Sequence, residues 1–380
     1  MWLVAAIAGL LFLATGITPW SQIGSVAGQV GPVLLFLIGI TVVAELSDAA
    51  GVFTAAAGWA ARLGRGSVRR LFGLVVVLAT VTTLVLSLDT TAVLLTPVVL
   101  ALAASLEISP IPFAMATVWL ANTASLLLPV SNLTNLLAMR TLGLSVTGFA
   151  GRTWLAAVLA VVVTVAVLTT RYRRDLRGRY QLPQPAPVQD RVLFRASGAV
   201  CLAVGPLFVA GANVAVVACA GAGILVVLFA VRQRSALRFG LVPWQLVLLV
   251  FGLFLVVRGG LDHGLGRVLT DAAGSASSAA GLGRMAGVSA VAANVVNNLP
   301  AFAALQPVAG ASVPRTLSLL AGVNLGPLIL LWGSLATLLW RERCEARDVR
   351  ISAGQFAAVG LVGVPLLLAA AVLGLDLVGR

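Results

Sequence analysis

Long apolar segments follow one another through most of this sequence, and they decide what the chain can fold into. Segments of roughly 17 to 25 residues recur from residue 2 to residue 375, each long enough to cross about 30 Å of hydrocarbon. Of the 380 residues, 60% are hydrophobic and 10% are charged, whereas soluble domains carry about 25% charged residues. The sequence therefore predicts an all-α, polytopic protein of the cell (inner) membrane, in contact with the lipid bilayer.

The basic residues indicate how these segments are oriented. All 25 are arginines, and 18 of them fall in four short blocks, at residues 62–70, 171–195, 232–238 and 341–350. Arginine-rich loops between membrane segments are cytoplasmic by the positive-inside rule. Because the basic residues gather in these loops, the net charge of +13 predicts a cytoplasmic face, and we expect no nucleic-acid partner.

If all four arginine blocks lie on the cytoplasmic side, the membrane segments of the first half and those of the second half have opposite orientations. We expect a first inverted repeat over 1–170, an Arg/Pro-rich cytoplasmic linker over 171–195, and a second repeat with one extra connecting helix over 196–380. A shift of 202 residues lays segment 122–137 on 324–339 without gaps and matches Asn122 with Asn324. Inverted repeats that are interrupted at corresponding positions are typical of secondary transporters, and the interruptions indicate the binding site.

Each half also contains an apolar stretch with a polar interruption near its middle. Residues 71–104 are interrupted at 87–91 and leave two arms of about 15 residues, or ~22 Å of helix, which is too short for a full crossing. We therefore predict a re-entrant helical hairpin with its tip at Asp89. Residues 285–309, which include Asn294, Asn297 and Asn298, are expected to form the matching hairpin, with these three side chains on one face if the stretch stays helical.

Two further segments, 113–139 and 316–340, are predicted to be broken transmembrane helices. Proline removes a backbone donor, asparagine and threonine are poor helix formers, and unwound backbone in lipid must face protein or a watery cavity. Helix-to-helix hydrogen bonding is the alternative explanation of these polar residues. The predicted substrate-binding residues are Thr90, Thr91, Asn122, Thr123, Ser125, Ser131, Asn132, Asn294, Asn297, Asn298 and Asn324.

Two acidic residues are of special interest. A carboxylate at mid-membrane is costly and indicates function by default, so Asp89 is the predicted proton-coupling residue, with a helix-capping role as the alternative. Glu45 closes the second apolar segment and either lines a cytoplasmic entrance or marks the membrane interface.

Four motifs resemble the arsenite efflux permeases of the ArsB type. They are ANTASLLLPVSNLTNL at 121–136, LDTTAVLLTP at 88–97, ANVVNNLP at 293–300 and GVNLGP at 322–327. The first is quite specific to that group, and the others are shared across the wider ion transporter superfamily, which includes sodium-coupled dicarboxylate carriers. One departure is Leu88 before Asp89, where relatives often have asparagine, so the tip has one amide fewer.

The resemblance implies a secondary active transporter that exports arsenite and antimonite in exchange for protons, by alternating access around a mid-membrane polar site. It also implies two inverted repeats, each with a re-entrant hairpin and a broken helix, a possible homodimer, and a possible separate ATPase subunit. Arsenite at neutral pH is largely an undissociated triol, which amides, hydroxyls and carbonyls can bind by hydrogen bonds.

Other functions stay open at this point. A sodium-coupled carrier of a small anion would use the same Asn, Ser and Thr clusters, and a sodium/proton antiporter would use Asp89. An enzyme is not expected, because a single histidine, His263, and three scattered cysteines supply neither a nucleophile–base pair nor a metal site. We therefore expect no catalytic residues, no metal ligands and no cofactor.

Overall fold

The computed structural model describes residues 2–182 and 189–379. The described residues form helices and no strand, apart from one isolated β-bridge between Ser67 and Arg179. Seven of these helices are long and apolar enough to cross a membrane, or up to nine spans if each of two bent pairs counts as one. The chain is therefore an all-α, multi-pass membrane protein, as predicted.

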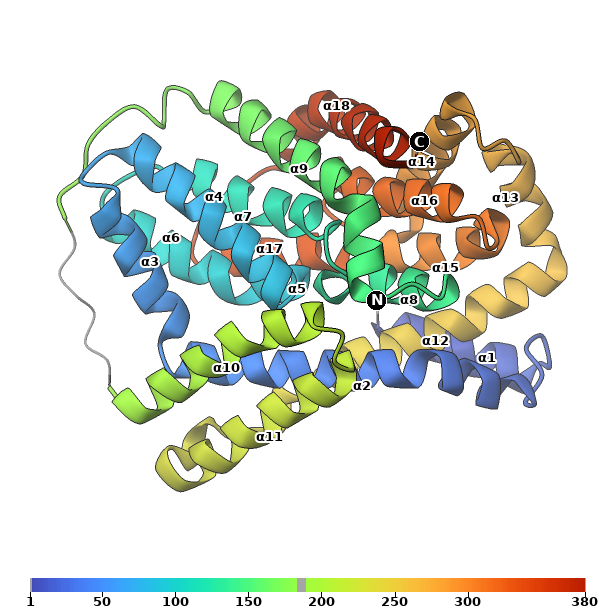
Figure 1. The fold of residues 1–380 in the computed structure, drawn as a ribbon, viewed down its shortest axis with the longest axis horizontal. Helices are drawn as coiled ribbons and strands as arrows, with labels where there is room; N and C mark the ends of the chain where they lie inside the picture. The colour runs from blue at the N-terminus through green and yellow to red at the C-terminus, as the bar shows by residue number, and fades with distance from the viewer. Residues whose placement is uncertain (1, 183–188, 380) are drawn as a thin grey trace.

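The first half contains nine α-helices (Figure 1). They are α1 Trp2–Ala14, α2 Gln22–Ala49, α3 Val52–Leu63, α4 Val68–Val85, α5 Leu88–Thr90, α6 Thr96–Ser105, α7 Ile111–Ala124, α8 Leu133–Thr141 and α9 Val146–Arg171. The second half also contains nine. They are α10 Arg191–Val209, α11 Val214–Arg232, α12 Trp244–Gly260, α13 Gly266–Ala273, α14 Ala279–Val296, α15 Asn298–Ala309, α16 Val313–Leu325, α17 Leu335–Glu345 and α18 Ala353–Gly379.

The helices pair in the crossed manner that an inverted repeat produces. Helix α1 packs along α12 while α11 packs along α2, and the two long helices α9 and α18 pack against each other. The chain bends by 61° between α2 and α3 and by 72° at the corresponding place between α12 and α13. At the first bend Gly51 has φ +82°, a conformation that glycine adopts without steric cost. The assignment of α10 as the extra connecting helix and the exact repeat boundaries stay predictions.

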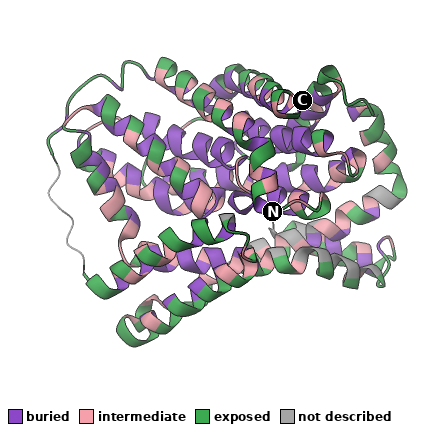
Figure 2. Cartoon of the chain, in the orientation of Figure 1, coloured by how far each residue is buried: buried purple, intermediate pink, exposed green. Residues whose placement is uncertain are grey.

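The core lies where the two broken helices meet. In α7 every residue from Pro112 to Ala124 is buried, and in α16 every residue from Arg315 to Leu325 is buried. Helices that are buried all round belong to the interior of a larger bundle. Figure 2 shows these central helices almost entirely in the buried colour, within the layer above α2, α10, α11 and α12.

The hairpin arms are longer than predicted. Helix α4 has 18 residues, and the returning arm from Leu88 to Ser105 also has 18, or ~27 Å each. The estimate of about 15 residues was wrong because α4 begins at Val68 and includes Arg69 and Arg70, long side chains that can reach water from a helix end. Figure 1 shows α4 entering toward α5 and α6 turning back to the same side.

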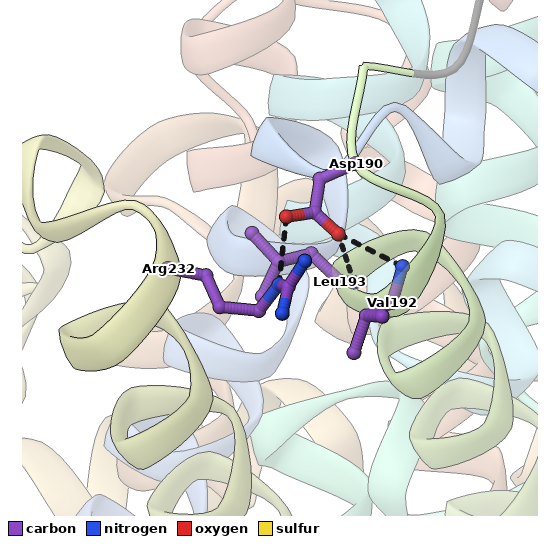
Figure 3. Close-up of polar contacts among 4 residues, drawn as sticks. All are labelled: Asp190, Val192, Leu193 and Arg232. Carbon is purple, nitrogen blue, oxygen red and sulfur yellow. Dashed lines mark hydrogen bonds and ion pairs between the residues drawn. The ribbon is translucent and has the colours of Figure 1, made fainter.

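Both described ends of the Arg-rich linker are anchored, while its residues 183–188, with Pro183, Pro185 and Pro187, lie outside the described residues. On the first side, the Tyr180 amide donates to Gly66 O at 2.9 Å. On the second side, Asp190 accepts from the amides of Val192 and Leu193 and pairs with Arg232 at 2.8 Å (Figure 3). The Arg232 hydrogen bond, with those amides, holds the pKa of Asp190 below its ordinary value.

Candidate functional site

The two hairpin tips share an unusual break at positions 210 residues apart. Ser87 separates α4 from α5, and Asn297 separates α14 from α15. Asn297 has φ +86° and ψ 156°, a region that costs a non-glycine residue about 1–3 kcal/mol. Its Nδ2 donates to Trp332 O at 3.0 Å. This bond joins the second tip to the segment after the break in α16.

The conditional prediction that Asn294, Asn297 and Asn298 share one helix face is wrong. Helix α14 ends at Val296, and the positive φ of Asn297 turns the chain before Asn298 starts α15. The three side chains therefore do not follow one helical repeat. Asn294 is the one of the three that lies within α14, while Asn298 is buried at the first position of α15.

Asn324 on α16 is the centre of a hydrogen-bond network between the two halves. Its Nδ2 donates to Asn135 Oδ1 at 2.8 Å, and its Oδ1 accepts from Asn132 Nδ2 at 2.9 Å and from Thr134 Oγ1 at 3.0 Å. Asn132 also caps α8 by accepting from the Thr134 amide. A fully paired amide network can be buried at low cost, so Asn324 holds the broken helix of the first half in place.

A second network ties the second hairpin to the break that follows α16. Asn294 Nδ2 donates to Gly326 O at 2.7 Å, and its Oδ1 accepts from the Leu330 amide at 3.0 Å. The backbone carbonyl of Asn294 accepts from Trp332 Nε1 at 2.8 Å. Together with the Asn297 bond to Trp332 O, these contacts satisfy the Gly326 carbonyl, the Leu330 amide and the Trp332 carbonyl after the end of α16, and non-helical backbone at membrane depth needs such protein partners.

The repeat partner of Asn324 is not paired in the same way. Asn122 donates from Nδ2 to Val118 O at 2.9 Å within its own helix, and its buried Oδ1 has no hydrogen-bond partner among the described residues. The residues that correspond to Asn132 and Asn135 in the second half are Ser334 and Thr337, and these bond to each other at 2.8 Å. The two halves are related in fold, but the Asn324 side chain is hydrogen-bonded to the opposite half and the Asn122 side chain is not.

A cavity of about 480 Å³ lies beside the first hairpin tip. Asp89 and Thr90 face it from the tip, Thr41 and Glu45 from α2, and Leu335, Leu339 and Arg343 from α17. Another side is lined by Gly240, Val242, Pro243, Trp244, Gln245 and Leu249. Arg343 belongs to the fourth arginine block, and Gly240 lies two residues after the end of the third. Because arginine-rich loops are predicted to be cytoplasmic, we expect the cavity to lie on the cytoplasmic side of the tip.

The predicted site residues fall into two groups. Among the described residues, Asp89 and Thr90 line the cavity. The others are buried, and most hydrogen-bond to protein groups. Thr91 pairs with Thr83, Thr123 accepts from Thr164, and Ser125 donates to Asn122 O. Ser131 donates to Leu84 O at 3.3 Å. Their role in substrate binding stays a prediction.

Several residues of the site were not in the predicted set. Thr134 and Asn135 complete the Asn324 network, and their only signal was the Asn, Ser and Thr cluster at 122–135. Glu45 lines the cavity, one of the two positions considered for it. Arg343 was read only as part of a cytoplasmic block, and no pattern in the sequence places it opposite Glu45.

Comparison with known proteins also indicates a membrane transporter. Residues 1–337 match the family model CitMHS, described as citrate transporter. The chain is 31% identical over 382 residues to the arsenical pump membrane protein of Escherichia coli K12, and 32% identical over 383 residues to that of Yersinia enterocolitica. Each alignment covers 94% of this chain and 89% of the relative.

A solved structure supports the fold independently. The YdaH transporter of Alcanivorax borkumensis, whose structure is described as having an unusual topology, matches with a TM-score of 0.57 and 14% sequence identity. The match covers 94% of this chain and 87% of that one. Such low identity shows a shared transporter fold and does not specify a substrate.

Proposed function

This chain belongs to the citrate transporter family and to the arsenical pump membrane proteins, and from that premise we propose that it exports arsenite from the cytoplasm in exchange for protons. That it is a membrane transporter follows from the family itself. Arsenite as the substrate, antimonite as a second substrate and protons as the coupling ion are the proposal. A homodimer and a separate ATPase subunit stay predictions.

The charge of the cavity is the observation that carries the choice of substrate. Among its described lining residues, Arg343 is the one basic side chain, while Glu45 and Asp89 are acidic. Citrate at neutral pH carries three carboxylates, which two wall carboxylates would repel. An undissociated triol carries no charge and needs hydrogen-bond donors and acceptors. Thr41, Thr90 and Gln245 on the cavity wall are side chains of that kind.

The unequal pairing of Asn122 and Asn324 supports alternating access. With the cavity on the cytoplasmic side, Asn324 is fully paired and Asn122 has a free buried acceptor. In inverted-repeat transporters one repeat moves relative to the other around a fixed site. We expect the outward-facing state to exchange these roles, so that Asn122 gains partners at the start of α17 and Asn324 loses partners at the start of α8.

Transport in inside-out vesicles tests the proposal. Vesicles with an acidic lumen should accumulate arsenite, with no requirement for Na⁺ and no inhibition by citrate. Vesicles from cells without the protein serve as the control. Uptake of citrate in place of arsenite would contradict the substrate, and uptake that requires Na⁺ would favour the sodium-coupled alternative.

A further inference from the structure

The mouth of the cavity is formed by matching faces of α2 and α17. Leu335, Leu339 and Arg343 occur at four-residue intervals and line the cavity from one face of α17, over ~12 Å of helix. Thr41 and Glu45 do the same on α2, over ~6 Å. Both faces end in a charged side chain near the cytoplasmic end of the helix, so Glu45 and Arg343 form the outer rim, and Asp89 lies at the inner end.

Four charged side chains act on one another at this rim. The charges of Arg343 and Arg238 both act on the Glu45 carboxylate, and Asp48, three residues further along α2, is in electrostatic contact with Glu45 and Arg343. Two acids and two bases balance there. Asp89 lies on a separate element, the hairpin tip, and lines the same cavity. A proton that leaves Asp89 toward the cytoplasm must therefore pass the rim.

We propose that Glu45 relays protons between Asp89 and the cytoplasm, with Arg343 as the neighbouring positive charge at the rim. This inference rests on the proposed proton coupling and adds a residue to it. Glu45 is half-buried and lines the cavity, whereas the cavity lining does not include Asp48 among the described residues. Glu45 is therefore the carboxylate through which the cavity communicates with the cytoplasm.

The step conserves charge and protons. The Asp89 carboxylic acid transfers its proton through water in the cavity to the Glu45 carboxylate, which leaves Asp89 ionised and Glu45 neutral. Glu45 then releases the proton to the cytoplasm and is again ionised, with the positive charge of Arg343 nearby. No oxidant, reductant or covalent intermediate is involved. Arsenite loading follows at the site from which the proton has left.

Measurements of net uptake and of counterflow together show whether Glu45 relays protons or only supports the structure. Net uptake into acidic inside-out vesicles requires proton release to the cytoplasmic side in each cycle, whereas counterflow of labelled against unlabelled arsenite requires none. Glu45→Gln should lower net uptake at least tenfold and leave counterflow within twofold of wild type. Glu45→Asp should restore net uptake to within threefold. Asp271→Asn, an exposed carboxylate on α13 that is not among the cavity-lining residues, is the control and should stay within twofold in both modes.

Any other result would contradict the proposed relay, and the pattern of losses would show why. Equal loss of net uptake and counterflow in Glu45→Gln would show a structural role, and retention of both would show that protons take another path. A similar loss in Asp271→Asn would show that loss of any carboxylate lowers uptake, and would refute the specific role of Glu45. Wild-type uptake that ignores the pH gradient would instead refute the proposed coupling, and the relay with it.

Discussion

Asn324 on α16 and Asn135 on α8 are joined by a hydrogen bond of 2.8 Å from Nδ2 to Oδ1, although 189 residues separate them in the chain. The bond connects the broken helix of one repeat to that of the other at the centre of the molecule. Every polar atom of the Asn324 side chain has a partner in this network. The account of alternating access depends on this pairing, because the corresponding Asn122 lacks it.

Substitution at the two repeat-related asparagines should therefore have unequal effects on stability. Asn324→Ala removes partners from Asn132, Thr134 and Asn135, and each buried group left unpaired costs about 1–3 kcal/mol. Asn122→Ala removes one local hydrogen bond together with an unpaired acceptor, so its cost should stay near 1 kcal/mol. Thermal unfolding of the purified proteins in one detergent measures both. Equal losses would contradict the assigned network.

The backbone of Asn297 predicts an order between two small substitutions. Both Asn297→Gly and Asn297→Ala remove the hydrogen bond to Trp332 O. Only alanine must then hold φ +86°, so the alanine variant should be less stable by about 1 kcal/mol or more. Unfolding temperatures of the two variants, compared side by side, test this. An alanine variant as stable as the glycine variant would show that the tip relaxes to another conformation.

Helix α18 packs against the break after α16 through a glycine. A Cβ atom on Gly360 would collide with the backbone of Leu328 and Ile329, whereas a Cβ atom on Gly354, in the same helix, would meet open space. Gly360→Ala should destabilise the protein by about 1–3 kcal/mol, as overpacking does. Gly354→Ala should be neutral or stabilise by up to about 1 kcal/mol. Arsenite uptake and unfolding temperature, measured together, check both variants, and a neutral Gly360→Ala would contradict the close contact.

The start of α10 should respond to acid through Asp190. Its pKa is lowered in the folded protein, first by the Arg232 hydrogen bond and then by the Leu193 amide. The contribution of a carboxylate with a lowered pKa is fully present above its unfolded value of about 3.9 and is lost as the pH falls through the folded pKa. Hydrogen exchange of the Val192 and Leu193 amides, corrected for intrinsic rates, should lose protection in that window.

The Asp190→Asn variant provides the control for that measurement. Asparagine can still cap the helix but cannot titrate in this range, so protection of the two amides should become independent of pH. Loss of protection in the variant at the same pH as in wild type would assign the transition to another group.

The sequence alone predicted the features of the fold that follow from hydrophobic patterning. The apolar segments and arginine blocks gave the membrane helices, and the match of Asn122 with Asn324 located both broken helices. The length of α4 was missed because Arg69 and Arg70 looked like a loop, although arginine side chains extend far enough to let a helix continue.

The site was less predictable because its contacts join distant parts of the chain. The polar clusters contained the right residues, but no local signal pairs Asn324 with Asn132 or Asn294 with the Leu330 amide. The turn at Asn297 could not be predicted either, because the spacing of Asn294, Asn297 and Asn298 also fits a continuous helix. The cavity depends on α2, α17 and the start of α12, and that arrangement arises only from tertiary packing.

Proton-driven arsenite uptake by the Asp89→Asn variant tests the central claim most directly. Inside-out vesicles with an acidic lumen would be compared for wild type, Asp89→Asn and Asp271→Asn, an exposed carboxyl on α13 that serves as the control. If Asp89 carries the exchanged proton, Asp89→Asn should abolish uptake driven by the pH gradient while arsenite counterflow continues, and Asp271→Asn should behave as wild type. Uptake that still follows the pH gradient in Asp89→Asn would contradict the assignment of Asp89 as the proton-coupling residue.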